Sequence, residues 1–365
     1  MTLLGRATFA GTASFRDSSK AAPGHFREQG GLALSSIGIG TYLGPGDQQT
    51  DLLYRDAVLR ALGLGINVID TAINYRNQRS ERAVGLALSA RSRAGVSREQ
   101  VFVATKGGFF AFDGARPRDQ HAWLEQTIFA RGLARPEEIA AGCHCMTPRY
   151  LEDQLERSLE NLGLETIDLY YLHNPETQLG EVPRGEFLER LRRAFEALEK
   201  ACAAGKIAAY GAATWNGLRI PEDDEEHLSL AELLACAREV GGAGHHFRGL
   251  QLPFNLEMDE AGALRNQRDS SGREATLLEA AAEAGLLVMA SASVLQGRLT
   301  RQVQQPPRDR LGAGAGAGTD AQHALQFVRS TPGITTALVG MKSPAHVEEN
   351  AALAQVPPRP AAAIP

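Results

Sequence analysis

Four ionisable side chains fall at or just after the ends of short apolar runs in the first half of the chain. Asp70 ends one such run, Lys106 ends the next and His173 ends a third, while Tyr75 follows shortly after Asp70. Side chains of these types can exchange protons with a bound molecule, so together they suit general acid–base chemistry. Each residue alone has an ordinary explanation as a solvated or internally satisfied polar group. Four of them at successive strand ends favour a shared site.

The elements that must position these residues are eight apolar or β-branched runs, each followed by a segment with helical periodicity. The predicted strands are Ser35–Tyr42, Asn67–Asp70, Val101–Lys106, Ile167–His173, Ile207–Thr214, Gly249–Asn255, Leu286–Ser293 and Thr335–Gly340. The predicted helices are Asp51–Leu64, Ser80–Arg91, Pro148–Leu162, Glu186–Ala204, Leu228–Val240, Ala275–Ala284, Ala321–Ser330 and Pro344–Leu353. Eight such units in series predict an α/β protein with a closed (β/α)8 TIM barrel, whose catalytic groups lie at the carboxyl ends of the strands. An open doubly wound sheet is the alternative, which the lack of a G-x-G-x-x-G motif after the first strand disfavours.

Residues at the predicted helix ends support these boundaries. Thr147 before Pro148 and Ser343 before Pro344 are expected to cap helices whose first turn begins with proline. Four glycines follow helical runs and are expected to end them in the left-handed conformation. They are Gly65, Gly163, Gly205 and Gly285.

Three segments fall outside the repeat of a single barrel domain. Residues 1–34 are expected to form an N-terminal arm or hairpin, 35–355 the barrel, and 356–365 a disordered tail. Residues 107–146 and 294–319 are expected to be loop insertions. The first contains Trp123 and a short helix near Pro136–Ala141, and its length is typical of a functional lid. The second ends in a Gly-Ala repeat, which favours flexibility.

The composition describes a chain that can bury a large core. Of its 365 residues 43% are hydrophobic, and 38 Lys and Arg against 43 Asp and Glu give a net charge of −5. This balance argues against a nucleic-acid partner, and no apolar run is long enough to span a membrane. No signal peptide is recognised at the N-terminus. The four cysteines, Cys143, Cys145, Cys202 and Cys236, are too few for a disulfide scaffold, so a cytoplasmic location is expected.

Four stretches resemble motifs of the aldo-keto reductase family. GINVIDTAINYRNQRSERAVG (Gly65–Gly85) and IDLYYLHNP (Ile167–Pro175) look like its signatures. GKIAAYGAATW (Gly205–Trp215) is similar in part to the fifth-strand motif, and LVGMKSPAHVEEN (Leu338–Asn350) to the C-terminal cofactor motif. The resemblance extends from about Leu34 to Leu353, and it implies the same barrel that the periodicity predicts.

The resemblance also implies a mechanism. Tyr75 would be the general acid that protonates a carbonyl oxygen while a nicotinamide cofactor delivers hydride. Lys106 would lower the pKa of Tyr75, which is near 10 for a free tyrosine. Asp70 would hold the ammonium group of Lys106. His173 would orient the substrate oxygen.

The cofactor implied by the resemblance is NADP (NADPH). The residues that match its contacts are Thr41, Tyr42, Asp70, Thr214, Gln251, Ser291, Val294, Gln296, Gly297, Gly340, Lys342, Ser343, His346, Glu349 and Asn350. The charge of Lys342 and the helix start near Ser343 favour a 2′-phosphate, and hence NADP over NAD.

Three positions depart from the family pattern. Ala213-Thr214 stands where the family usually has Ser-Asn to hold the carboxamide, so one polar group is missing. Ser291 replaces an aromatic residue that stacks on the nicotinamide, a contact worth on the order of 1 kcal/mol. His346 stands where the family often has Arg. We expect these changes to weaken or reposition the cofactor without abolishing its binding.

Cys143-His144-Cys145 raises the question of a metal site. Two thiolates one residue apart need further ligands, and no second cluster has the spacing of a zinc site. We therefore expect an ordinary loop and no metal.

The leading hypothesis is an NADP-dependent aldo/keto reductase that acts on a small-molecule carbonyl compound or the corresponding alcohol. One alternative is a regulatory, redox-sensing barrel that binds NADP with little turnover, which the missing nicotinamide contacts favour. Another is a lyase or epimerase that uses Tyr75 and Lys106 without net redox change. The intact set of four ionisable residues favours the reductase over the regulatory barrel.

Overall fold

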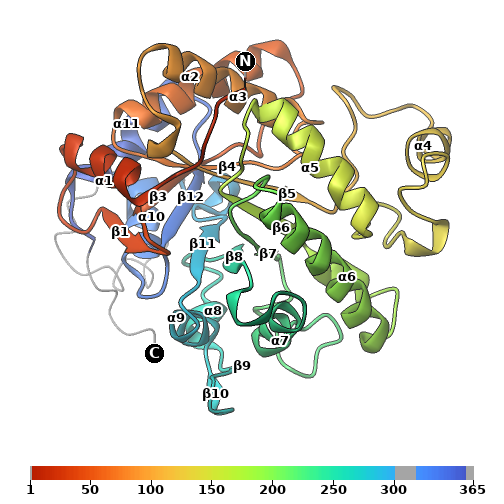
Figure 1. Cartoon of the computed structure of the whole chain (residues 1–365). Coiled ribbons are helices and arrows are strands. Elements are labelled where there is room, and N and C mark those ends of the chain that lie inside the picture. The colour runs from red at the N-terminus through yellow and green to blue at the C-terminus, as the bar shows by residue number, and fades with distance from the viewer. Residues whose placement is uncertain (1, 301–317, 359–365) are drawn as a thin grey trace.

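The centre of the computed structural model, which describes residues 2–300 and 318–358, is a closed barrel of eight parallel strands (Figure 1). The strands are β3 (Ile37–Gly40), β4 (Val68–Asp70), β5 (Phe102–Gly107), β6 (Leu169–His173), β7 (Tyr210–Ala213), β8 (Phe247–Pro253), β11 (Leu287–Ser291) and β12 (Thr336–Gly340). They pair in chain order, and β12 pairs with β3 to close the barrel. The barrel prediction is confirmed, and the open sheet is excluded.

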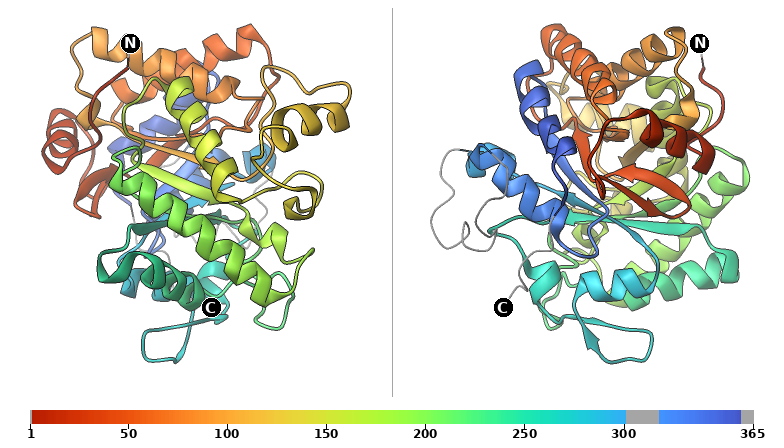
Figure 2. Two further views of the ribbon diagram at one scale, coloured as in Figure 1. Left: turned by 45° about the vertical axis from the view of Figure 1, so that its right-hand side comes forward. Right: turned by 90° about the vertical axis from the view of Figure 1, so that its left-hand side faces the viewer.

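Eight helices that follow the barrel strands form an outer layer around them (Figure 2). They are α2 (Gln48–Gly63), α3 (Arg79–Arg93), α5 (Pro148–Leu162), α6 (Arg184–Ala203), α7 (Leu230–Gly241), α9 (Leu277–Glu283), α10 (Asp320–Ser330) and α11 (Pro344–Ala351). Each corresponds to a predicted helix, and no predicted helix or strand end is off by more than three residues. The apolar stripe of each helix packs on the outward side chains of the strands, which is why periodicity alone located them.

The helix ends follow the predicted chemistry with one exception. Thr147 accepts a hydrogen bond from the N–H of Tyr150, and the four predicted stop glycines all have positive φ. Ser343 occupies the N-cap position of α11 with proline in the first turn, as predicted, but its side chain makes no capping hydrogen bond. The turn is instead closed by the main chain, where Val347 N–H donates to the Ser343 carbonyl.

The segment before the barrel holds helix α1 (Phe9–Ser18) and an antiparallel hairpin of β1 (Phe26–Gln29) and β2 (Leu32–Ser35). Leu34 packs in one apolar cluster with Val68 and Phe102, the first residues of two barrel strands. The hairpin therefore closes the amino-terminal end of the barrel, against which it lies in Figure 2. The open end is the opposite one.

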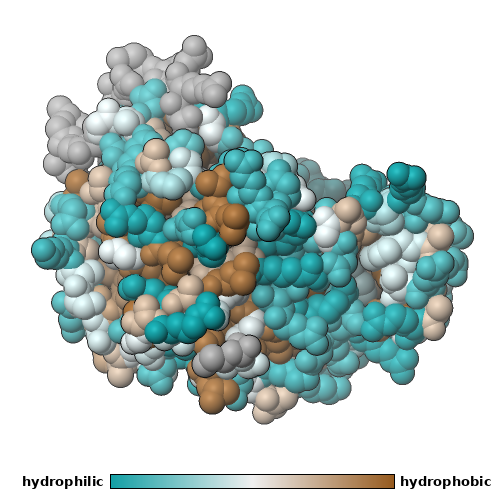
Figure 3. Space-filling view, turned by 90° about the horizontal axis from the view of Figure 1, so that it is seen from above, coloured by the Kyte–Doolittle hydropathy of each residue, from teal (hydrophilic) through white to brown (hydrophobic). Residues whose placement is uncertain are grey.

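The 107–146 insertion forms a small substructure beside α5. It contains α4 (Gln120–Leu124), a π-helical turn (Glu125–Phe129) and a 3-10 turn (Pro136–Glu138), and it has its own apolar cluster around Phe110 and Ile128. Figure 3 shows it as a mostly hydrophilic projection on the right of the molecule.

The remaining regular elements are short. They are the 3-10 turns Arg98–Gln100, Pro175–Gln178, Gly242–Gly244, Leu295–Thr300 and Ala352–Gln355, helix α8 (Glu260–Ala263), and strands β9 (Gln267–Arg268) and β10 (Glu274–Ala275). Residues 301–317 of the predicted second insertion and 359–365 of the predicted tail lie outside the described residues. Across residues 2–300 and 318–358, no helix combines the length and apolar character needed to cross a membrane. All four cysteines lie within these ranges and are free thiols.

A buried ion pair ties the N-terminal segment to the barrel. Asp168, just before β6, accepts hydrogen bonds from the guanidinium of Arg98 and from the N–H groups of Ala7 and Val103, each at 2.7 Å. The side chains of Arg98 and Asp168 are only 4% and 2% exposed. Bulk water therefore has little access to the Arg98 guanidinium and solvates its charge poorly when the Asp168 carboxylate is removed.

We expect Asp168→Ala to lower the free energy of unfolding by about 3–5 kcal/mol, because the substitution leaves the Arg98 charge buried and unpaired. Urea unfolding of the purified protein measures this change. The matched control is Glu189→Ala, which removes solvent-exposed ion pairs such as that with Arg192 and should leave the urea midpoint almost unchanged. Equal losses for the two variants would contradict the role of the buried pair.

Candidate active site

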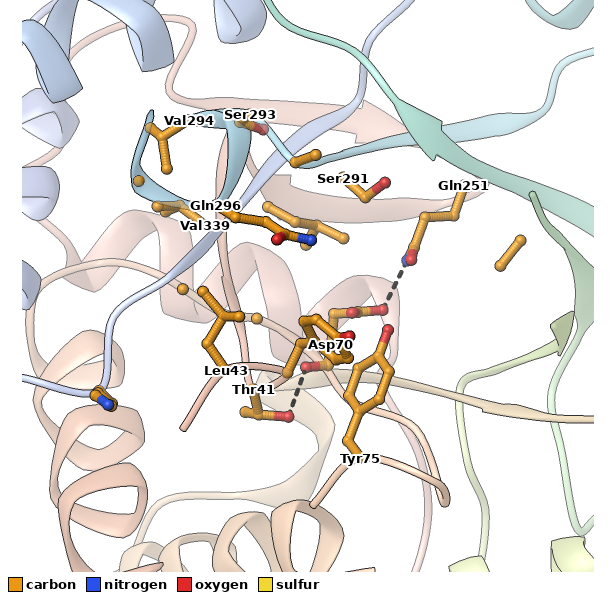
Figure 4. A pocket seen from close by; sticks show the side chains of 18 of the residues that line it. Thr41, Leu43, Asp70, Tyr75, Gln251, Ser291, Ser293, Val294, Gln296 and Val339 are labelled. Carbon is orange, nitrogen blue, oxygen red and sulfur yellow. Dashed lines mark hydrogen bonds between the residues drawn. The ribbon is translucent and has the colours of Figure 1, made fainter. Parts of the chain in front are cut away.

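The carboxyl ends of the barrel strands surround a cavity of about 1190 Å³. Asp70, Tyr75 and His173 line it, as do all the predicted cofactor residues except Ser343 (Figure 4). Lys106 does not line the cavity, because its side chain is fully buried behind Asp70. The residues of the predicted site thus converge on one end of the barrel, the end opposite the hairpin.

The ion pair of Asp70 and Lys106 lies at the base of the cavity. The Lys106 ammonium group donates to both carboxylate oxygens of Asp70 at 2.8 Å and to the Thr71 carbonyl at 2.9 Å. Gln251 donates its amide N–H to Asp70 Oδ1 at 2.7 Å, the upper dashed line in Figure 4. The register of the barrel strands brings Asp70 and Lys106 together. Asp70 pairs with Ala104, and Lys106 follows Ala104 by two residues on the same face of β5.

Tyr75 lies over this ion pair. Its ring centroid is 4.7 Å from the Lys106 ammonium group, and Figure 4 shows its hydroxyl directed toward Asp70. Burial raises the pKa of Tyr75, and the charge of Lys106 offsets only part of that rise. Lys106 thus acts on the pKa of Tyr75 in the expected direction, but burial outweighs it and the net shift is upward. The phenol stays protonated at neutral pH and can donate its proton.

Lys106 is charged in this setting. Burial acts to lower the pKa of Lys106, but Asp70 and Tyr75 outweigh burial and the net shift is upward. The site therefore presents a fixed positive charge next to a neutral phenol. This arrangement favours the phenolate at the moment Tyr75 loses its proton.

His173 is neutral. Burial lowers the pKa of His173 well below 6.5, and the Lys106 charge adds to this effect. Its ring lies 5.9 Å from that of Tyr75, centroid to centroid. Within the described chain its Nδ1 atom has no hydrogen-bond partner. The imidazole can therefore hydrogen-bond to a ligand without changing its charge.

A strained turn follows Tyr75. Arg76, Asn77 and Gln78 have φ values of 50°, 57° and 70°, a run of left-handed residues that costs on the order of 1 kcal/mol each. The buried Arg76 guanidinium holds the turn, since it bonds to Asp51 at 2.7 Å and to the Pro45 carbonyl at 2.8 Å. The same contacts fix the loop after β3.

That loop carries Tyr42, whose side chain is 54% exposed at the cavity and lies edge-on to the Tyr75 ring with centroids 4.9 Å apart. Trp215 from the loop after β7 is 40% exposed and also lines the cavity. Ala213 and Ser291 line it too.

Two basic side chains, Lys342 and Arg298 from the loop after β11, also line the cavity, together with His346 and the carboxylate of Glu349. The sequence analysis did not select Arg298, although it directly follows the predicted Gln296 and Gly297. It also missed Asn74, Phe109 and Asn174, which line the cavity near Tyr75 and His173. Their place in the sequence could have revealed them. Asn74 and Asn174 are next to predicted site residues, and Phe109 lies two residues after the end of β5.

No group of three or more His, Cys, Asp or Glu side chains in residues 2–300 and 318–358 is arranged to hold a metal ion. His144, between the two cysteines, is buried and bonds to the main chain of His173 instead.

We expect the His173 ring signals in an NMR titration to show no protonation step between pH 8 and 5, because the neutral ring is held in a buried, positively charged setting. In urea-unfolded protein the histidines should titrate near pH 6.5. The unfolded chain therefore takes up this proton first, and lowering the pH below 6.5 favours unfolding through His173. A midpoint near 6.5 in the folded protein would contradict the assignment of a neutral His173.

Comparison with known proteins identifies relatives of this barrel. The model of the aldo/keto reductase family matches residues 36–222. A protein named NADH-specific methylglyoxal reductase, from Escherichia coli K12, is 30% identical over 207 residues, which is 55% of this chain and about half, 54%, of that protein. A Schizosaccharomyces pombe protein, provisionally named voltage-gated potassium channel subunit beta, is 25% identical over 347 residues, covering 91% of this chain and 88% of that one.

A solved structure extends the likeness across the barrel. The aldo/keto reductase from Klebsiella pneumoniae, in complex with NADP and acetate, has a TM-score of 0.60 at 22% identity and covers 91% of this chain and 90% of its own. At this identity the likeness supports the fold alone. The family model, which spans half of the chain, supports the family. This chain belongs to the aldo/keto reductase family.

Proposed function

We propose that the protein is an NADP-dependent oxidoreductase that reduces an aldehyde or ketone to the alcohol, or catalyses the reverse reaction. The observation that carries the proposal is the contact of a neutral phenol, Tyr75, with the charged Lys106 at the base of a large cavity. This pairing suits proton donation to a carbonyl oxygen.

The cavity fits a dinucleotide cofactor together with a small substrate. Its volume of about 1190 Å³ exceeds the roughly 300–1,000 Å³ of common ligand pockets. Lys342 and Arg298 supply positive charge to its lining, as phosphate groups require. In the described structure Thr214 Oγ1 and Asn350 Oδ1 are buried without a hydrogen-bond partner, and both residues line the cavity. Polar atoms in this state are suited to binding the polar groups of a ligand.

The mechanism follows from the states of the four central residues. A bound nicotinamide supplies the hydride. Tyr75 donates its phenolic proton to the carbonyl oxygen, and the neighbouring Lys106 charge stabilises the phenolate that remains. Asp70 fixes Lys106 and balances its charge when Tyr75 is neutral. Neutral His173 hydrogen-bonds to the substrate oxygen and orients it toward Tyr75.

The substrate is a small molecule with a carbonyl or alcohol group. The cavity lining includes three aromatic side chains, Tyr42, Phe109 and Trp215, and the amides of Asn74 and Asn174. Flat apolar walls and neutral amides suit an uncharged compound better than a carboxylate.

A regulatory barrel that binds NADP with little turnover is the second candidate. Two observations favour it: Ala213 and Ser291 lack the usual nicotinamide contacts, and one relative is named as a channel subunit. A lyase or epimerase with the same Tyr75 and Lys106 is the third. The three functions differ in whether the reduced cofactor is oxidised and in whether a substrate is converted.

The experiment that tests the proposal supplies purified protein with NADPH or NADH and a panel of aldehydes and ketones, and follows the absorbance of the reduced nicotinamide. Oxidation of the cofactor with formation of alcohol supports the reductase. Tight NADPH binding without oxidation across the panel supports the regulatory barrel. Conversion of a substrate without oxidation supports a lyase or epimerase.

We expect Tyr75→Phe to lower kcat by at least about 100-fold, because it removes the proton donor and keeps the ring. Fluorescence titration should show NADPH affinity close to that of the wild type. Turnover near the wild-type rate would remove Tyr75 from the acid role.

We expect Lys342→Ala to weaken NADPH binding about ten- to a hundredfold more than NADH binding, because only NADPH carries the 2′-phosphate and a charged hydrogen bond is worth about 1.5–3 kcal/mol. Titration of both cofactors measures the difference, and Lys342→Arg is the control that keeps the charge. Equal losses for the two cofactors would place Lys342 away from the phosphate. The same titration shows whether this protein prefers NADPH or shares the NADH preference stated in the name of its Escherichia coli relative.

A further inference from the structure

The 107–146 insertion places one buried histidine against the main chain of the candidate active site. His144 is fully buried, and its Nε2 lies 2.8 Å from the carbonyl oxygen of His173. A carbonyl only accepts hydrogen bonds, so Nε2 carries the proton and donates it. Burial lowers the pKa of His144 to about 4, so the ring is neutral at physiological pH.

A chain of hydrogen bonds fixes this tautomer from the other side. Gln178 donates its amide N–H to His144 Nδ1 at 2.8 Å, and its carbonyl oxygen accepts from Arg190 at 2.7 Å. Arg190 is in turn held by Glu186 at 2.6 Å. In this chain of hydrogen bonds Arg190 donates to Gln178, Gln178 donates to His144, and His144 donates to the His173 carbonyl. The His144 ring is therefore held in one orientation.

The insertion is built around this contact. A Cβ atom on Gly108 would lie 2.8 Å from His144 Nε2 and 3.2 Å from the His173 carbonyl, so only glycine leaves room for the histidine there. Phe109 lies edge-on between the two rings, with centroids 5.1 Å from His144 and 5.0 Å from His173. Of residues 107–146, all of which the structure describes, Phe109 alone lines the cavity.

The main chain needs such support after His173. Strand β6 ends there, and Asn174 turns away with a φ of 47°. The Asn174 N–H bonds to the Ala213 carbonyl of β7 at 2.6 Å, and the His173 carbonyl accepts the hydrogen bond from His144 of the insertion. Removing His144 would take away this buried hydrogen bond at the end of β6.

We propose that His144 is a positioning residue for the active site, which holds the His173 main chain and the Phe109 ring and so sets where the His173 imidazole stands. The proposal rests on the proposed reductase function for its kinetic readout. In this proposal the 107–146 insertion supports the end of β6, whereas the sequence had suggested a lid. The proposal also gives the histidine between Cys143 and Cys145 a role that needs no metal.

The kinetic test compares His144→Leu with a matched control, His25→Leu. His25 is also fully buried and within 2.9 Å of a main-chain carbonyl, that of Gly65, but it lies at the amino-terminal end of the barrel. We expect His144→Leu to lower kcat about 10- to 100-fold with little change in NADPH affinity, since misplacement of a reacting group by about 1 Å has effects of this size. His25→Leu should leave kcat within about threefold, even where both variants lose stability.

Rescue separates hydrogen bonding from packing. His144→Gln keeps an N–H donor at a similar reach and should recover most of kcat, whereas His144→Leu should not. Equal kcat losses in the His144→Leu and His25→Leu variants, or a glutamine variant no better than the leucine variant, would overturn the proposal.

An activity-independent measurement keeps the proposal testable on its own. The NMR signals of the His173 ring, assigned by their loss in His173→Gln, should shift in both His144→Leu and the more conservative Gln178→Leu, and stay in place in His25→Leu. Unchanged His173 signals in folded His144 and Gln178 variants would overturn the positioning role. If the wild type oxidises no NADPH, the proposed function fails, and this measurement still decides the role of His144.

Discussion

The buried ion pair between Lys106 and Asp70 is the interaction on which the rest of the site depends. An ammonium group without exposure to water is tolerated only where its charge is matched and its three protons are bonded, and Asp70 with the Thr71 carbonyl meets both needs. The barrel register brings the two side chains together, so the fold itself maintains the charge. Tyr75 then experiences two opposing effects on its pKa, burial and a nearby cation, and burial is the larger.

Side-chain hydrogen bonds tie the loops around the reacting groups to one another and to the ends of the strands. Arg76 ties the turn after Tyr75 to the loop after β3, and His144 ties the 107–146 insertion to the end of β6. A third tie has the same character: the carboxylate of Glu176 accepts the N–H groups of Trp215 and Asn216 from the loop after β7. Tyr42, Phe109 and Trp215 can therefore form cavity walls although they belong to three different connections.

The sequence predicted the barrel and most of the candidate site because both depend on local patterns. Apolar runs mark the strands, and a parallel barrel brings every strand end to one rim, so Asp70, Lys106 and His173 could be grouped without coordinates. Contacts between loops have no such periodicity, and the bond from His144 to His173 could not be foreseen. The net shift in the pKa of Tyr75 depends on the depth of burial, which a motif does not carry. Helix α1 was missed as well, because most of its residues are polar or small and its apolar stripe is weak.

The left-handed turn at Arg76, Asn77 and Gln78 has a consequence for protein engineering. Three successive residues in this conformation exclude proline and disfavour β-branched side chains, so many members of a library that varies them would lose stability. The cavity wall formed by Tyr42 and Trp215 carries no such backbone restriction, since neither residue has positive φ and both are substantially exposed. Altered substrate scope is therefore best sought by varying the wall and leaving the turn, with its arginine, as it is.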